Sequence, residues 1–137
     1  MFEPFVYRVK VVRWVDGDTV VVDFDLGFGV WLKDQSLRLY GVNTPERHPS
    51  KAKYTKDGVF NKAGFDDEVG HANAALAFVM AQIPVGADAI VKTRKDADEK
   101  YGRWLAEITA AKGADKTVNA LLVEKGFAAA YFGGARP

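Results

Sequence analysis

One ten-residue stretch, residues 37–46, combines the side-chain types that phosphate chemistry requires. Arg38 lies in an apolar run that is typical of a strand, and Asn43, Thr44 and Glu46 follow where a glycine and a proline end that run. A guanidinium binds phosphate in a planar, two-point geometry that lysine cannot reproduce. A carboxylate can activate water or hold a cation. The stretch therefore predicts a phosphate-handling site, although a surface strand followed by a loop would have the same composition.

Two other segments contain residues that would complete such a site. In residues 16–19, Asp18 is a candidate ligand for a divalent cation, because hard cations prefer carboxylate oxygens. The Asp-Gly pair before it is equally typical of a hairpin turn. In residues 100–106, Arg103 follows a glycine between two aromatic side chains, so that packing can fix its position. This arginine is a candidate second phosphate contact, whereas the charged residues before it fit a solvated loop.

The N-terminal third of the chain has the pattern of consecutive strands. Residues 5–15 are rich in β-branched and aromatic types with alternating polarity, and residues 19–24 fit a return strand after the turn. Residues 30–32 and 37–42 predict further strand, with polar residues between them as an interruption. We therefore expect a strand meander in this part of the chain.

The remaining residues predict a long loop, two helices and two more strands. Residues 47–65 contain four lysines and predict an extended surface loop. A helical spacing of apolar residues follows over 69–83, and Asp66 and Asp67 favour its N-terminus. The later elements are expected as strands at 87–93 and 104–109 and a second helix, which Asp115 or Thr117 caps and Gly126 ends.

Strands first, then a helix, then two strands and a helix predict an α+β fold. A five-stranded, partly open β-barrel of the OB type with two to three packed α-helices fits this order, and such barrels present loops that bind oligonucleotides. With 137 residues, the chain suits a single domain over residues 1–137. We expect a monomer, since nothing in the sequence indicates a partner face.

Composition excludes several classes of site and partner. The chain has no cysteine, which excludes disulfides, thiolate zinc sites and a cysteine nucleophile. A net charge of +1 is too small for coating DNA through charge alone, so that contacts with nucleic acid must be local. No signal peptide and no run of about 20 apolar residues is visible. We therefore expect no membrane partner and favour an intracellular location.

Taken in order, the three segments resemble the motifs of the staphylococcal nuclease (thermonuclease) family. Asp-Gly-Asp-Thr at 16–19 is similar to the first motif, and Arg-Leu-Tyr-Gly-Val-Asn-Thr-Pro-Glu at 38–46 is similar to the second. Lys-Tyr-Gly-Arg-Trp-Leu-Ala at 100–106 is similar to the third, and residues 118–119 and 126–128 resemble the last helix and its exit. Three ordered motifs are far more specific than any one of them.

The resemblance implies an OB-type barrel that carries a calcium-dependent nuclease. It would hydrolyse phosphodiester bonds of DNA and RNA, single- or double-stranded, with little sequence preference, and would leave 3′-phosphate ends. The implied Ca2+ ligands are Asp18, Asn43 and the backbone carbonyl of Thr44. Glu46 would be the general base or would orient the attacking water.

The same resemblance assigns the phosphate and substrate contacts. Arg38 and Arg103 would hold the scissile phosphate and stabilise its transition state. Lys100 and Tyr101 are expected to contact substrate. Tyr131 either stacks on a base or sugar, as aromatic side chains do in single-strand binders, or belongs to the core or surface.

Asn43 departs from the family pattern, which has a second carboxylate ligand at this position. Its amide carbonyl is still an oxygen that calcium accepts, but the metal site loses one negative charge. We therefore expect weaker calcium affinity than a second Asp would give, unless another acid compensates.

Two other functions compete with the nuclease. Some larger proteins contain repeats of this type that have lost their catalytic residues, so a catalytically weak or inactive OB-fold module that binds nucleic acid or protein is the main rival. A phosphodiesterase acting on small nucleotides is the third reading. Joint retention of Asp18, Arg38, Glu46 and Arg103 favours the enzyme. The loop lysines argue against a small-nucleotide substrate.

Overall fold

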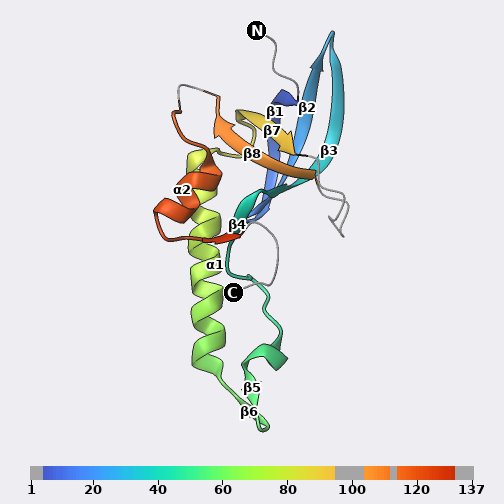
Figure 1. Ribbon diagram of the computed structural model, residues 1–137. Helices are drawn as coiled ribbons and strands as arrows, with labels where there is room; N and C mark the ends of the chain where they lie inside the picture. The colour runs from blue at the N-terminus through green and yellow to red at the C-terminus, as the bar shows by residue number, and fades with distance from the viewer. Residues whose placement is uncertain (1–4, 95–103, 112–113, 132–137) are drawn as a thin grey trace.

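The computed structural model describes residues 5–94, 104–111 and 114–131, and a closed five-stranded barrel forms its upper part (Figure 1). Its strands lie in the order β1 (Val6–Asp16), β2 (Thr19–Gly27), β3 (Val30–Leu39), β8 (Trp104–Ala110) and β7 (Asp88–Arg94). Strand β3 runs parallel to β8, and the other neighbouring pairs of the barrel are antiparallel. The predicted α+β fold with an OB-type barrel is confirmed, but the barrel is closed because β7 pairs with β1.

Strand β3 is continuous, so the expected interruption by polar residues at 33–36 was wrong. The first half of β3 pairs with β2 in a ribbon whose side chains are largely exposed. The register shifts at Lys33 and Asp34, where Asp34 has a φ of 55°, so the polar residues form a bulge that does not end the strand. The real break is at Tyr40, between the end of β3 at Leu39 and Gly41, whose φ of 80° favours glycine. Beyond it, β4 (Gly41–Asn43) leaves the barrel and pairs with β9 (Ala129–Tyr131), a strand that the sequence did not suggest.

The alternation in β1 changes phase once, and this shift joins the barrel to the first helix. Val9 and Val11 face the core as the period predicts, and a register shift between Val11 and Arg13 then buries Trp14. The indole Nε1 of Trp14 donates a 2.9 Å hydrogen bond to the carbonyl of Ile83, just beyond the end of helix α1 (Lys62–Gln82).

Helix α1 begins earlier than predicted. Asn61 is its N-cap, and the Asn61 side chain accepts a 3.0 Å hydrogen bond from the backbone N–H of Gly64. Asp66 and Asp67 therefore lie in the second turn of the helix instead of at its start. The apolar spacing revealed the buried stripe of the helix, but the cap chemistry of an asparagine determines where the helix begins.

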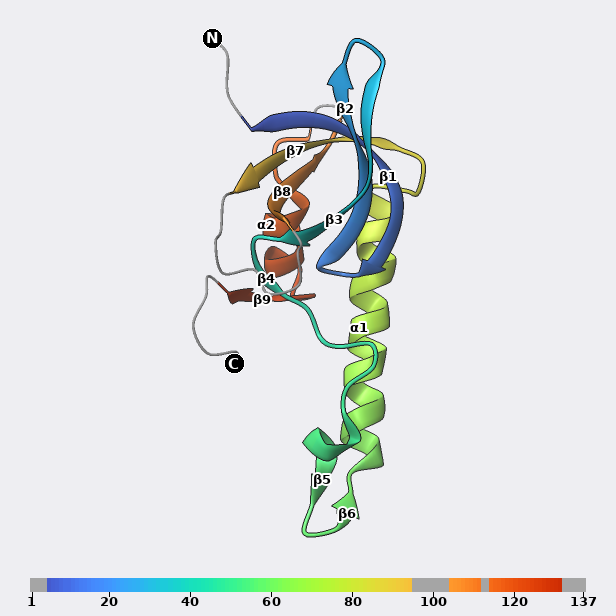
Figure 2. The same cartoon turned by 90° about the vertical axis from the view of Figure 1, so that its right-hand side faces the viewer.

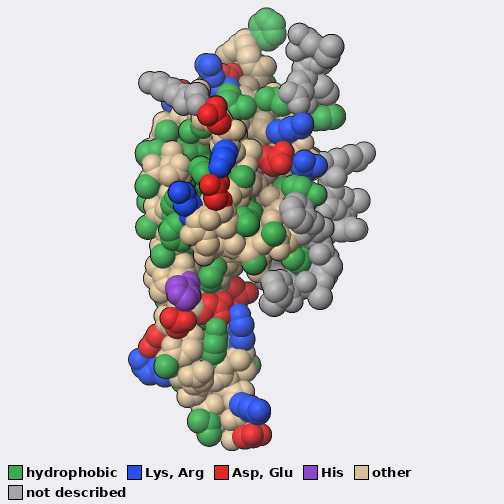
Figure 3. Space-filling view, turned by 60° about the vertical axis from the view of Figure 1, so that its left-hand side comes forward, with side chains coloured by type: hydrophobic (Ala, Val, Ile, Leu, Met, Phe, Trp, Pro, Cys, Tyr) green, Lys and Arg blue, Asp and Glu red, His purple; other side chains and the backbone are tan. Residues whose placement is uncertain are grey.

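The segment expected as an extended loop is largely structured. Residues 51–60, which we call the arm, contain a 3-10 helix η1 (Lys51–Tyr54) and a small hairpin of β5 (Thr55–Lys56) and β6 (Val59–Phe60). Figures 1 and 2 show the arm beside the N-terminal end of α1, far from the barrel. In the space-filling view of Figure 3, this part narrows into an extension that carries side chains of both charges.

The second helix confirms one of the two predicted caps. Helix α2 (Val118–Glu124) has Thr117 as its N-cap, and Gly126 follows its end with a φ of 80°. Together with α1 it covers a core of aliphatic side chains from all five barrel strands. Within the described residues, neither α-helix is long and apolar enough to cross a membrane.

Candidate functional site

One pocket of about 130 Å3 collects side chains from two of the three sequence segments. Strand pairing explains this gathering, because Thr19 at the start of β2 lies opposite Arg38 in β3. The backbone of Asp18 also accepts a 2.8 Å hydrogen bond from the N–H of Leu39. The lining residues are Asp16, Asp18 and Thr19 from the β1–β2 turn, Arg38 from β3, and Asn43, Thr44, Pro45 and Glu46 from β4 and the loop after it.

Asp18 and Arg38 form an ion pair in the wall of this pocket. Their nearest charged atoms, Oδ2 and Nη1, are 3.3 Å apart, and the exposed fractions of the two side chains are 13% and 9%. The Asp18 carboxylate also accepts 3.1 Å hydrogen bonds from the backbone N–H of Thr44 and the hydroxyl of Thr19. Buried charges need such partners, because leaving water is costly for an isolated ion. The turn and the β4 exit are thereby tied together through one carboxylate.

Asn43 lies beside the guanidinium. Its Oδ1 accepts a 3.4 Å contact from Nη2 of Arg38, and Nη1 of Arg38 donates a 3.2 Å bond to the carbonyl of Leu39. The same arginine therefore contacts both Asp18 and Asn43, the two side chains that the sequence predicted as metal ligands.

The possible ligand atoms in this pocket are of the type that a hard cation prefers. They are oxygens, and the hydroxyl of Thr44 is buried with no hydrogen-bond partner in the described part of the chain. Across residues 5–94, 104–111 and 114–131, however, no cluster of three or more histidine and acidic side chains is arranged to hold a metal. A cation here would depend on amide, hydroxyl and backbone oxygens in addition to carboxylates.

Four other predicted site residues need separate mention. Lys100, Tyr101 and Arg103 lie outside the described residues. Tyr131 is half-buried on β9, opposite Gly41 in β4, and lines neither this pocket nor the larger cavity next to it.

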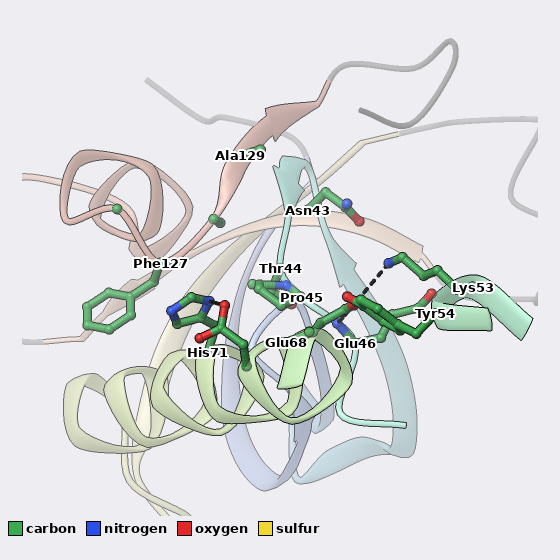
Figure 4. Close-up of a pocket in the computed structure, with 14 residues that line it drawn as sticks. Asn43, Thr44, Pro45, Glu46, Lys53, Tyr54, Glu68, His71, Phe127 and Ala129 are labelled. Carbon is green, nitrogen blue, oxygen red and sulfur yellow. Dashed lines mark hydrogen bonds and ion pairs between the residues drawn. The ribbon is translucent and has the colours of Figure 1, made fainter. Parts of the chain in front are cut away.

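The larger cavity has a volume of about 760 Å3 and shares the wall of residues 43–46 with the pocket (Figure 4). Its other walls come from the arm, helix α1 and the segment 126–129. Charged and titratable side chains in these walls include Glu46, Lys53, Asp67, Glu68 and His71.

Glu68 is a residue of this cavity that our sequence analysis missed. Its carboxylate accepts hydrogen bonds from the backbone N–H of Glu46 at 2.9 Å, from Nζ of Lys53 at 2.8 Å and from the hydroxyl of Tyr54 (Figure 4). A signal was present, because Glu68 shares the helical stripe of Ala72, Ala75 and Val79, which are buried. An acid in phase with the buried residues of a helix indicates a paired carboxylate.

The partners of Glu68 determine its charge. Burial raises the pKa of Glu68, but the hydrogen bonds from Lys53, Tyr54 and the Glu46 backbone outweigh it and lower the pKa below its ordinary value. The hydrogen bond to Glu68 raises the pKa of Lys53 and that of Tyr54. Because the folded-state pKa of Glu68 is depressed, its contribution to stability is present above its unfolded pKa. That contribution is lost as the pH falls through the folded-state pKa.

A comparison with curated proteins found no match for the chain. A comparison with family models matched residues 36–136 to the staphylococcal nuclease homologue family. The matched range contains Arg38, Asn43, Thr44 and Glu46, whereas Asp18 precedes it and joins them through the pairing of β2 with β3. Since this range is most of the chain, and the barrel with two helices agrees with it, the chain belongs to the staphylococcal nuclease family.

Proposed function

We propose that the chain is a calcium-dependent nuclease that hydrolyses phosphodiester bonds of DNA and RNA with little sequence preference and leaves 3′-phosphate ends. The observation that carries the proposal is the single pocket lined by Asp18, Arg38 and Glu46. A carboxylate for a cation, a guanidinium for phosphate and a second carboxylate for water are the groups that this reaction needs. Membership of the family supports the same chemistry.

Arg38 would bind the scissile phosphate. Hydrolysis builds negative charge on the phosphoryl oxygens, so fixed cations stabilise the transition state. The contact between Arg38 and Asn43 is long for a hydrogen bond at 3.4 Å, and a phosphate oxygen could replace Asn43 while the guanidinium stays beside Asp18. Arg103 would supply the second guanidinium, and Lys100, Tyr101 and Tyr131 would contact the nucleotides.

Glu46 would act as the general base. Its carboxylate would take a proton from water as the water oxygen bonds to phosphorus. The bond to the 5′ oxygen would break at the same time, and the leaving oxygen would take a proton from solvent water. Asp18, Asn43 and Thr44 would hold calcium, which when bound supplies positive charge against the phosphoryl oxygens. The unpartnered hydroxyl of Thr44 supports a polar ligand at this wall.

The test is cleavage of plasmid and single-stranded DNA with calcium or with a calcium chelator. We expect cleavage with calcium alone, 3′-phosphate ends on the products, and a loss of at least ~100-fold in kcat for Glu46→Gln, which removes the base and keeps its size. Glu107→Gln is the matched control, because Glu107 lies on β8 outside the pocket and pairs with Arg94.

Absence of calcium-dependent cleavage would reject the proposal. If wild type and the Glu46→Gln variant both fail to cut DNA and RNA at the same protein concentrations, the chain is not a nuclease. Retention of single-stranded DNA in a gel-shift assay under those conditions would identify the nucleic-acid-binding module instead.

A further inference from the structure

Helix α1 contains a buried carboxylate that the proposed reaction does not use. Glu68 is 9% exposed, although glutamate is among the side chains least often buried. Its helix neighbours on the buried face are Ala72, Ala75 and Val79, so an apolar residue would be expected at this position. A charge in such a place requires compensation by hydrogen bonds and opposite charge.

The two oxygens of Glu68 bind two different segments of the chain. Oε2 accepts the backbone N–H of Glu46, and Oε1 accepts Nζ of Lys53 together with the hydroxyl of Tyr54. Figure 4 shows Glu68 next to Glu46, Lys53 and Tyr54 at the wall of the larger cavity. One carboxylate thus connects helix α1 to the loop that carries Glu46 and to the arm.

The loop around Glu46 is held from two sides. On the barrel side, the N–H of Thr44 donates to Asp18 at 3.1 Å, and Nη1 of Arg47 donates to the carbonyl of Val15 at 2.7 Å. Pro45 has no N–H, so the N–H of Glu46 is the next backbone donor after Thr44. Glu68 takes this donor from the helix side, so the backbone of Glu46 is fixed between the barrel and α1.

We propose that Glu68 is a positioning residue for Glu46, which it holds through the backbone N–H at the wall of the pocket. This inference rests on the proposed role of Glu46 as general base. A general base must lie within hydrogen-bond reach of the attacking water, and misplacement by about 1 Å can cost two orders of magnitude in rate. Helix α1 would therefore contribute to catalysis without touching the substrate.

A purely structural role of Glu68 makes a different prediction. If the carboxylate serves to attach the arm to α1, removing Lys53 and Tyr54 as partners should reproduce the effect of removing Glu68. The variant Tyr54→Phe with Lys53→Met removes the contacts to Oε1 and leaves the contact to Oε2 intact. The phenylalanine also keeps the ring that packs edge-to-face on Phe65.

The first measurement is amide hydrogen exchange at Glu46, followed by NMR. Glu68→Ala should speed exchange of this amide by at least about tenfold, because a charge-assisted hydrogen bond is lost. Amides of the buried barrel residues Val22 and Val91 should speed up by a smaller factor, because they report only the loss of overall stability. Asp67→Asn is the matched control, since Asp67 lines the same cavity but is 72% exposed and pairs with His71.

The second measurement is steady-state cleavage with calcium. Glu68→Ala should lower kcat by at least about tenfold and leave KM within about twofold, because positioning acts on the transition state and not on binding. In a Glu46→Gln background the same substitution should have no further effect on kcat. Glu68→Gln, which retains one acceptor oxygen and nearly the same volume, should be intermediate and serves if the alanine variant does not fold.

The outcomes separate the two proposals. Wild type without nuclease activity overturns the proposed function, and this inference with it. An active wild type whose Glu46 amide is unaffected by Glu68→Ala overturns the positioning role alone. So does an equal fall in kcat for Glu68→Ala in the Glu46→Gln background, or an equal effect of Tyr54→Phe with Lys53→Met.

Discussion

Asn43 sets the net charge of the candidate site, because it is neutral where an aspartate would add a negative charge. Its amide oxygen faces the Arg38 guanidinium at 3.4 Å, and the guanidinium is 3.3 Å from the carboxylate of Asp18. Because the Asn43 oxygen is neutral, Asp18 supplies the only negative charge among these two contacts of Arg38. An added carboxylate would change both the pairing of the arginine and the attraction for a cation.

Asn43→Asp should tighten calcium binding. The substitution adds a negative charge and keeps an oxygen ligand of nearly the same size, and calcium affinity rises with ligand charge. Isothermal titration calorimetry should show a lower Kd for calcium, by about tenfold if the added charge contributes about 1.4 kcal/mol. Unchanged or weaker calcium binding would contradict this prediction and would show that the new carboxylate pairs with Arg38 instead of calcium.

Asn61→Asp is the matched control for this prediction. It makes the same chemical change at the N-cap of α1, where either side chain can accept the N–H of Gly64. Because Asn61 lies outside the pocket, its replacement should leave the calcium Kd unchanged.

At the scale of elements, Asn119 joins α2 to the barrel beside the site. Its Oδ1 accepts the N–H of Ile108 at 3.0 Å, and its Nδ2 donates to the carbonyls of Tyr40 at 2.8 Å and Ala106 at 3.0 Å. Tyr40 lies between β3 and β4, so this one amide helps to hold the point at which the chain leaves the barrel toward Asn43.

Asn119→Ala should lower the free energy of unfolding by about 2 kcal/mol, because the buried N–H of Ile108 loses its acceptor and the part-buried carbonyl of Tyr40 loses a donor. The Ala106 carbonyl keeps a hydrogen bond from the N–H of Tyr40. Urea denaturation followed by tryptophan fluorescence measures this change. Asn73→Ala is the control, since Asn73 is an exposed residue of α1 and alanine favours the helix. A loss for Asn119→Ala no greater than that for Asn73→Ala would mean that water replaces the missing amide.

At the scale of the whole molecule, Gly17 marks where the barrel, the loop and helix α1 meet. Gly17 does not have a positive φ, so the turn itself does not require glycine. The requirement is space, because a Cβ at Gly17 would lie 2.9 Å from Cβ of Ala75 and 3.0 Å from Cγ2 of Thr44. The Asp-Gly pair that predicted a hairpin therefore also permits close packing of this turn on α1.

Gly17→Ala should destabilise the protein by about 1–3 kcal/mol, because the added methyl group overpacks a contact between backbone elements. Gly70→Ala provides the opposite control. It adds the same methyl group within helix α1, where nothing lies within 4 Å, and should stabilise the protein by roughly 1 kcal/mol. The urea midpoints of unfolding report the change in stability for both variants. If both substitutions change the stability in the same direction, the packing argument is wrong.

Local chemistry accounts for the features that could be read in advance. Alternation of side chains predicted β1 and β2, Thr117 and Gly126 bounded α2, and the motif residues Asp18, Arg38 and Glu46 were recognised from their types and order. Each of these features depends on neighbours within one or two turns of chain, so sequence patterns contain it. The family followed from the same motifs.

Contacts between distant segments account for the rest. Closure of the barrel depends on pairing between β1 and β7, about eighty residues apart, and the meeting of Asp18 with Arg38 depends on the register of β2 with β3. The polar residues of β3 were mistaken for a break because their exposure on a projecting ribbon is a tertiary property. The place of Glu68 on the buried stripe of α1 is visible in the sequence, but its partners are not. A buried acid becomes favourable here because Glu46, Lys53 and Tyr54, which come from other segments, surround it.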